Sequence, residues 1–316
     1  MHNAAHDGCI VQLNDTAMNA CCKKIQVAFF IVLIHLLPLR GIAQVKRPPL
    51  PGIAFVELQV SDLKKSTRFY ADLLGYQLVP GKAGADRKIH SVDVLINGRQ
   101  SVKIQDGLPA DRDERLLSVA FRTTDAAALR LYLQSKGIRV PPAVHKETAG
   151  WRWFGVTDPD NHTIKFVQYT TNTQEQPKIA PRPAISARIL HAGLTIASAA
   201  AADAFYKDIL GFSEIWRGGS SDSVTSWINM CLPESTDYLE YMLVKGTVNR
   251  QQLGSAHHIA LMVPDMQQAL DVLNSRTHTT PYTIAAPRVG RNKRWQLNLF
   301  DPDGTRIELM EPFPMR

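Results

Sequence analysis

Two adjacent histidines, His257 and His258, stand at the start of an apolar segment with the pattern of a β-strand, "HHIALMV". Neutral imidazole is a common ligand of divalent metal ions. Successive side chains of a regular strand point to opposite faces, so only one of this pair can enter a given pocket. His191 begins the pattern His-x-x-Leu-x-Ile, and His258 begins His-x-x-Leu-x-Val. This shared register favours His258 as the ligand and predicts that His257 faces the other way, as a rim or supporting residue.

The segments around these histidines belong to an internal repeat. A strand pattern at 55–62 and another at 191–198 each precede a helix that ends in a similar phrase, "RFYADLLGYQLV" and then "AFYKDILGFSEI". A second strand and helix follow in each half, and an Asp-Pro-Asp turn leads into the last strand. The chain is therefore predicted to be α+β, with four tandem βαβββ modules whose sheets curl into two cupped, open-barrel domains.

Length and composition limit the possible organisation and partners. The 316 residues suffice for about two domains. We predict one domain at 45–170, a polar, proline-containing linker at 171–187 and a second domain at 188–316. The formal net charge is +7, but the basic residues are dispersed, so a nucleic-acid partner is not expected. A small-molecule substrate is expected instead, bound by a monomer or a homodimer.

Residues 1–44 have the parts of a secretory signal peptide. Two lysines precede the apolar run 25–39, and the small residues Gly41 and Ala43 follow it. Cleavage is expected after Ala43, which would make the protein secreted or periplasmic. The apolar run is shorter than the roughly 20 residues of a comfortable membrane span, so no stable span is expected after cleavage. An uncleaved N-terminal anchor is the alternative.

From about Pro51 to Pro312 the pattern resembles the vicinal-oxygen-chelate superfamily, which includes glyoxalase I, extradiol dioxygenases and fosfomycin- and bleomycin-resistance proteins. In that family, paired βαβββ units form an open cup around a divalent metal ion, with ligands from the first and last strands of each unit. The resemblance implies one metal ion per chain (Ni, Zn, Mn, Co or Fe), held in the second half by His191, Glu240, His258 and Glu308. Two histidines and two carboxylates suit a borderline divalent ion.

The first half lacks this set. The matching positions hold Phe55, about Lys103, Ser118 and Lys165. A lysine ammonium that faces the cup would repel a cation. Glu57 lies on the same strand face as Phe55, but it has no matching ligand partners. The first half is therefore interpreted as a metal-free copy. A complete site requires either that the third and fourth modules close on each other, which is the leading hypothesis, or that two second halves swap modules in a dimer.

The resemblance implies an enzyme, and the leading hypothesis is a glyoxalase-like lyase or isomerase. Its metal would stabilise an enediolate-type intermediate on a small oxygenated substrate, and Glu308 or Glu240 would take the proton from carbon. The alternative is an extradiol-type ring-cleaving dioxygenase that uses His191, His258 and Glu308. In that enzyme a fourth ligand at Glu240 would crowd the oxygen position. A non-catalytic small-molecule binding protein of the same fold is a third possibility.

Four other residues of the second half are candidates to line the cup: Trp227, Asn229, Arg294 and Gln296. An arginine there would suit a carboxylate or phosphate on the substrate. Export argues against the cytoplasmic glutathione adduct on which glyoxalase I usually acts, so the substrate is left open.

Overall fold

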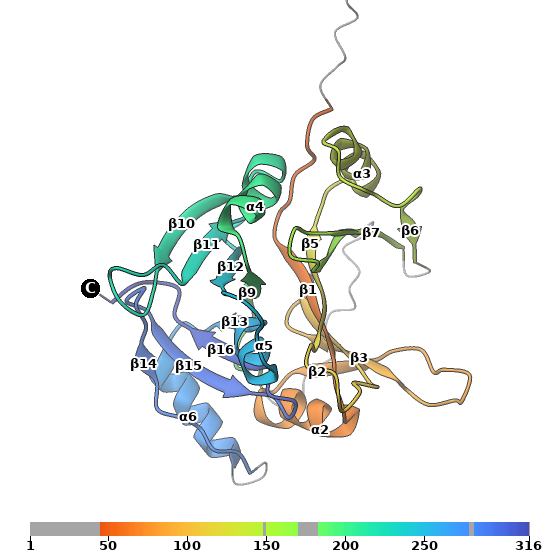
Figure 1. Ribbon diagram of the computed structural model, residues 1–316. Coiled ribbons are helices and arrows are strands. Elements are labelled where there is room, and N and C mark those ends of the chain that lie inside the picture. The colour runs from red at the N-terminus through yellow and green to blue at the C-terminus, as the bar shows by residue number, and fades with distance from the viewer. Residues whose placement is uncertain (1–44, 148–149, 170–182, 278–280, 316) are drawn as a thin grey trace, which may run out of the picture. The chain divides into compact units, whose positions relative to one another are not determined.

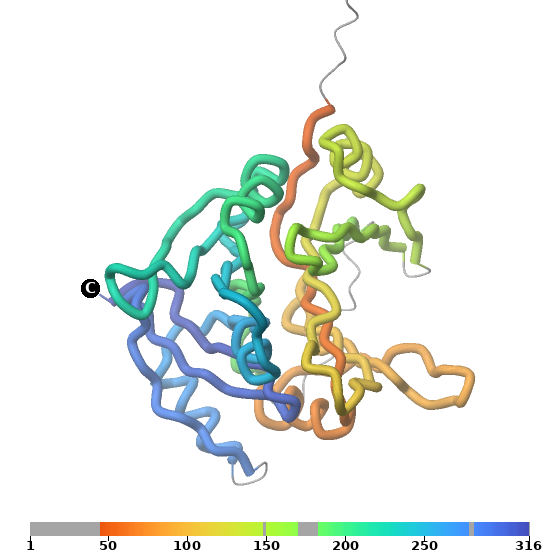
Figure 2. The backbone as a smooth tube through the Cα atoms, in the orientation of Figure 1, coloured from red at the N-terminus to blue at the C-terminus, as the bar shows by residue number. Residues whose placement is uncertain are grey.

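The computed structural model describes residues 45–147, 150–169, 183–277 and 281–315 (Figure 1). The leader, its expected cleavage after Ala43 and residues 171–182 of the expected linker lie outside these ranges. Val45–Arg316 forms one compact unit, and its backbone can be followed in Figure 2. Within the described ranges, no helix has both the length and the apolar character needed to cross a membrane.

The first half folds as two βαβββ modules that share one eight-stranded sheet, in the order β2-β3-β4-β1-β5-β8-β7-β6. The first module comprises β1 (Ile53–Gln59), α2 (Leu63–Arg68) with its π-helical continuation η1 (Phe69–Leu73), β2 (Gln77–Pro80), β3 (Ser91–Leu95) and β4 (Ser101–Gln105). The second comprises β5 (Leu116–Arg122), α3 (Ala126–Ser135), β6 (His145–Lys146), β7 (Trp151–Thr157) and β8 (Thr163–Tyr169).

The second half repeats this topology, in the order β10-β11-β12-β9-β13-β16-β15-β14. Its first module comprises β9 (Ile189–Ile196), α4 (Ala199–Asp203) with its π-helical continuation η2 (Ala204–Ile209), β10 (Ser213–Gly218), β11 (Trp227–Cys231) and β12 (Tyr238–Leu243). Its second comprises β13 (Ile259–Met262), α6 (Met266–Thr277), β14 (Arg288–Val289), β15 (Trp295–Phe300) and β16 (Arg306–Met310). The predicted α+β architecture of four βαβββ modules is confirmed.

One helix of the second half was not predicted. Helix α5 (Arg250–Ala256) lies between β12 and β13, and it begins with a capping box in which Asn249 and Gln252 bond each other's backbone. In the first half, the described residues between β4 and β5 form no helix. Because α5 ends directly before His257, it sets the direction in which the two adjacent histidines enter β13.

The first strand of each half is central in its sheet, which explains its apolar sequence. Strand β9 is hydrogen-bonded to β12 on one side and to β13 on the other, and all eight of its residues are buried. A strand buried on both faces is expected to be almost continuously apolar. His191 is therefore an exception within this strand, since it places a polar ring at a fully buried position.

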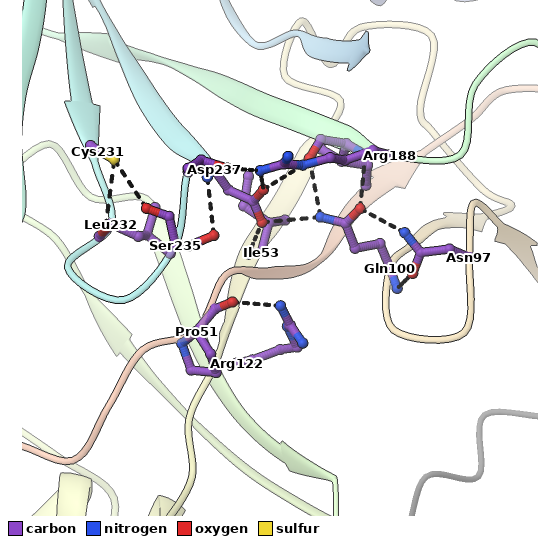
Figure 3. A network of polar contacts seen from close by, with 12 residues as sticks. Pro51, Ile53, Asn97, Gln100, Arg122, Arg188, Cys231, Leu232, Ser235 and Asp237 are labelled. Atoms are coloured by element: carbon purple, nitrogen blue, oxygen red, sulfur yellow. Dashed lines mark hydrogen bonds and ion pairs between the residues drawn. The ribbon is translucent and has the colours of Figure 1, made fainter. Parts of the chain in front are cut away.

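The two halves exchange equivalent hydrogen bonds beside these first strands (Figure 3). The Ile53 N–H donates to Asp237 Oδ2 at 3.0 Å, and the Ile189 N–H donates to Gln100 Oε1 at 2.9 Å. Both acceptors directly precede the last strand of a module. The Arg188 guanidinium also donates to Asp237. This reciprocal pattern ties the repeats together through matching positions.

Candidate metal centre

The four predicted ligands come together at the centre of the second sheet. His191 lies on β9, Glu240 on β12 and Glu308 on β16, while His258 directly precedes β13. Ala260 of β13 pairs with both His191 and Glu308, which fixes the register across three strands. All four residues are buried, and one ligand atom from each lies within 4.8 Å of the others. Among the described residues, this is the only such group of three or more metal-ligating side chains.

The separations between these atoms suit a single ion. His258 Nε2 lies 2.9 Å from His191 Nε2, 3.1 Å from Glu240 Oε2 and 3.5 Å from Glu308 Oε2. His191 Nε2 lies 3.7 Å from Glu240 Oε2 and 3.8 Å from Glu308 Oε2. Ligand atoms bound at about 2.1 Å to one ion are about 3.0 to 3.4 Å apart in octahedral or tetrahedral geometry. The donor set therefore fits a divalent ion with little rearrangement.

Each imidazole is held by a different neighbour. His258 Nδ1 lies 2.9 Å from the Ala256 carbonyl oxygen, which accepts its hydrogen and leaves the Nε2 lone pair for a ligand. The His191 ring stacks on the Tyr238 ring, with centroids 4.4 Å apart and planes at 26°. His191 Nδ1 is buried and has no hydrogen-bond partner among the described residues. The tautomer of His258 is thus set by a hydrogen bond, while the plane of His191 is set by packing.

Burial sets the protonation of the centre. It lowers the pKa of both His191 and His258 well below the usual range, so both rings are neutral near pH 7. Burial raises the pKa of Glu308 to about 7, an effect that the charge of Arg306 opposes and the charge of Glu240 increases. Without an ion, the Glu308 carboxyl is therefore partly protonated near neutrality.

Metal binding is expected to release a proton from Glu308. A ligating carboxylate must be ionised, and a group with a pKa of about 7 is mostly protonated at pH 6 and mostly ionised at pH 8. Binding should therefore release about 0.9 proton at pH 6 and about 0.1 at pH 8. Titration calorimetry in buffers of different ionisation enthalpy measures this number. Equal release at both pH values would contradict the assignment of Glu308 as a ligand with a raised pKa.

A cavity of about 290 Å³ opens onto Glu240 and Glu308. Two of the four residues that were predicted to line the cup, Trp227 and Gln296, do so. The other two are not among its lining residues. Asn229 is buried beside Glu240, with which it pairs between β11 and β12, and Arg294 lies on the segment that enters β15.

Sequence reasoning missed three large side chains of this cavity, Trp216, Arg288 and Arg306. Arg306 was detectable in principle, because residues two apart on a strand share a face and Arg306 is two residues before Glu308. Trp216 and Arg288 lie on β10 and β14, whose positions around the cup depend on how the sheet curves. No local sequence pattern gives that curvature.

His257 points away from the ligand cluster, as strand alternation predicts. Its Nδ1 lies 2.9 Å from Glu114 Oε1, and its Nε2 lies 2.9 Å from Thr195 Oγ1. The same hydroxyl lies 3.2 Å from His162 Nε2. Glu114 and His162 belong to the first half, so His257 connects that half to the strand that carries His191.

The first half has an internal ion pair where the second half has its ligand cluster. Strand register in the two halves makes Phe55, Lys103, Ser118 and Lys165 the counterparts of His191, Glu240, His258 and Glu308. Glu57 Oε2 accepts from Lys165 Nζ at 2.5 Å and from Ser118 Oγ at 2.7 Å. Burial acts to raise the pKa of Glu57, but the charge and hydrogen bonds of Lys165 lower it overall. A lysine thus supplies the positive charge that an ion would supply in the other half.

Comparison with known proteins agrees with this architecture. The sequence model of the Glyoxalase/Bleomycin resistance protein/Dioxygenase superfamily matches residues 52–166 and 188–309 of this chain. A comparison with curated protein sequences finds no significant match. Solved structures with a similar fold include the 2,3-dioxygenase LapB from Pseudomonas sp. KL28, at 16% identity and a TM-score of 0.62, with 85% of this chain and 96% of that chain covered.

Two further structures show the same likeness. The Mn(II)-bound glyoxalase from Novosphingobium aromaticivorans has 17% identity and a TM-score of 0.63, with 84% of this chain and 83% of that chain covered. Homoprotocatechuate 2,3-dioxygenase from Arthrobacter globiformis has 19% identity and a TM-score of 0.61, with 86% and 83% covered. With both halves matched by the family model, the chain belongs to the Glyoxalase/Bleomycin resistance protein/Dioxygenase superfamily.

Proposed function

We propose that this protein is an exported, metal-dependent enzyme of glyoxalase type, a lyase or isomerase that moves a proton on a small oxygenated substrate. The observation that carries the proposal is the position of Glu240. Glu240 Oε2 lies 3.1 Å from His258 Nε2, which is nearer than Glu308 Oε2 at 3.5 Å. Two carboxylates therefore meet the histidine pair, and His191, Glu240, His258 and Glu308 would together hold one divalent ion.

The bound ion would act as a Lewis acid that polarises a substrate oxygen. The rest of the chemistry falls to the protein's own side chains. Glu308, a carboxylate beside the ion and the cavity, would accept a proton from a substrate carbon and return it. Neutral His191 and His258 would each offer an Nε2 lone pair to the ion, and the apolar strands around them limit access of water.

A ring-cleaving dioxygenase of the extradiol type is the second candidate. It is favoured by the structural likeness to two 2,3-dioxygenases. His191, His258 and Glu308 would supply its two-histidine, one-carboxylate set, which must leave positions open for substrate and oxygen. Glu240 counts against this candidate, because its carboxylate reaches into the same space.

Hydrogen exchange in D₂O separates these reactions. Protein loaded with Ni²⁺ or Mn²⁺ should introduce deuterium at the carbon next to a carbonyl in a panel of α-hydroxy aldehydes and ketones, observed by NMR under argon. Glu308→Gln should abolish the exchange. Glu214→Gln is the matched control, since Glu214 is a carboxylate of the same half that pairs with exposed Arg217. Turnover that requires both Fe²⁺ and O₂, with no exchange under argon, would instead support the dioxygenase.

A further inference from the structure

Arg306 is a cation at the edge of the ligand cluster. It lies on β16 two residues before Glu308, and its Nη1 is 3.9 Å from Glu308 Oε2. The side chain is 14% exposed, and its buried Nε has no hydrogen-bond partner among the described residues. A guanidinium with an unused buried donor beside a cavity is suited to bind an oxyanion of a ligand.

The charges around the cavity also favour an anion. The carboxylates of Glu240 and Glu308 would offset the charge of one divalent ion. Arg288 also lines the cavity and forms no ion pair among the described residues, whereas Arg291 is paired with Asp222. Within the described ranges, Arg288 therefore has no carboxylate partner, and the only carboxylate that pairs with Arg306 is Glu308, whose charge is already counted toward the ion.

The cavity walls restrict the rest of the ligand. Trp216, Trp227 and Met242 supply flat or apolar surface. The volume of about 290 Å³ is at the lower end of the range for ligand pockets, which begins at about 300 Å³. These features suit a small molecule with an apolar body.

The first half provides an internal comparison. Lys165 pairs with Ala120 as Glu308 pairs with Ala260, so the counterpart of Arg306 two residues earlier is Thr163. The half without the ligand cluster thus also lacks the arginine. A role in the common fold would apply to both halves, whereas a role toward a ligand applies only to the second.

We propose that the substrate class of this site is a small carboxylic acid with two adjacent oxygen functions, and that Arg306 and Arg288 bind its carboxylate. The inference rests on the proposed function, since the adjacent oxygens are assigned to the ion. Arg306 is the main determinant, because it is the less exposed of the two arginines and the nearer to Glu308 in sequence.

The test compares 3,4-dihydroxybenzoate with 3,4-dihydroxybenzamide, which has the same adjacent oxygens and nearly the same shape but no charge. Binding to the Co²⁺-loaded protein is measured by titration calorimetry under argon. The acid should bind at least about tenfold more tightly than the amide. Arg306→Gln should remove most of this preference and leave amide affinity unchanged, and Arg306→Lys should retain part of it.

Arg217→Gln is the control, because it removes the same charge from an exposed site on β10. Equal affinity for acid and amide, or an unchanged preference in Arg306→Gln, would overturn the proposal. If Arg306→Gln does not fold, Arg288→Gln takes its place with the same criterion. If the wild-type protein holds no Co²⁺, the proposed function fails, and the same comparison on metal-free protein then decides the anion site alone.

Discussion

Glu240→Ala will lose its metal ion as completely as His258→Ala. The wild-type protein is expected to retain about one divalent ion per chain, in the cluster of His191, Glu240, His258 and Glu308. Removing one of four ligands leaves three buried polar groups around an incomplete site. We expect at least a 100-fold loss of affinity in each variant, more than is typical for losing a group that only supports a ligand. Mass spectrometry of metals after gel filtration in the presence of a weak chelator measures the retained ion.

Glu214→Ala is the matched control for this experiment. Glu214 is a carboxylate on β10 of the same half, and it pairs with Arg217 rather than with the cluster. It should retain the wild-type metal content. An ion lost from His258→Ala but kept by Glu240→Ala would show that three ligands suffice, and it would favour the dioxygenase. Two ions per chain would contradict a single centre in the second half.

The sequence was most informative where the repeat could be compared with itself. The shared His-x-x-Leu register of the repeat makes His191 and His258 equivalent positions, and the resemblance to the superfamily added Glu240 and Glu308 as ligands from the last strands of their modules. That register separates His258 from His257, and the hydrogen bonds of His257 to Glu114 and Thr195 agree with it. Alternation along an extended segment therefore predicted that these two adjacent side chains point in opposite directions.

The features that the sequence did not predict depend mostly on contacts between segments that are distant in sequence. Helix α5 begins at a capping box, yet its apolar pattern is too short to have been identified. Trp216 and Arg288 reach the cavity because β10 and β14 lie at opposite edges of a curved sheet. Glu57 was expected to have no matching ligand partners, and no sequence pattern indicated that it would instead bind Lys165, Ser118 and Gln105, which lie on three other strands. No local sequence pattern indicates these contacts.

The comparison between the two halves also explains why residue 193 is a glycine. Gly193 occupies the strand position that Glu57 has in the first half, as the pairing of Glu240 with Gly193 and of Lys103 with Glu57 shows. A Cβ at Gly193 would lie 2.1 Å from His258 Nδ1 and 2.5 Å from the Ala256 carbonyl oxygen. The His258 ring and the side chain at this position therefore exclude each other. The second half combines glycine with histidine, and the first combines Glu57 with Ser118.

Gly193→Ala should consequently displace the His258 ring and the backbone that orients it. Because the His258 ring and the Ala256 carbonyl are buried, we expect a loss of about 3 kcal/mol in the free energy of unfolding. Metal affinity should fall at least about 100-fold, because the hydrogen bond from His258 Nδ1 to Ala256 would be broken as well. Denaturant unfolding of the metal-free protein and calorimetric titration of the metal measure the two effects separately.

Gly155→Ala is the matched control, since Gly155 is also a strand glycine and its added Cβ would meet no atom closer than 3.8 Å. It should change stability by less than about 1 kcal/mol and leave metal binding intact. Combining Gly193→Ala with His258→Ser should recover part of the stability but none of the metal affinity, because the smaller side chain relieves the overlap and supplies no imidazole. Normal metal affinity in Gly193→Ala would mean that His258 has room to move, and that glycine is not required for the centre.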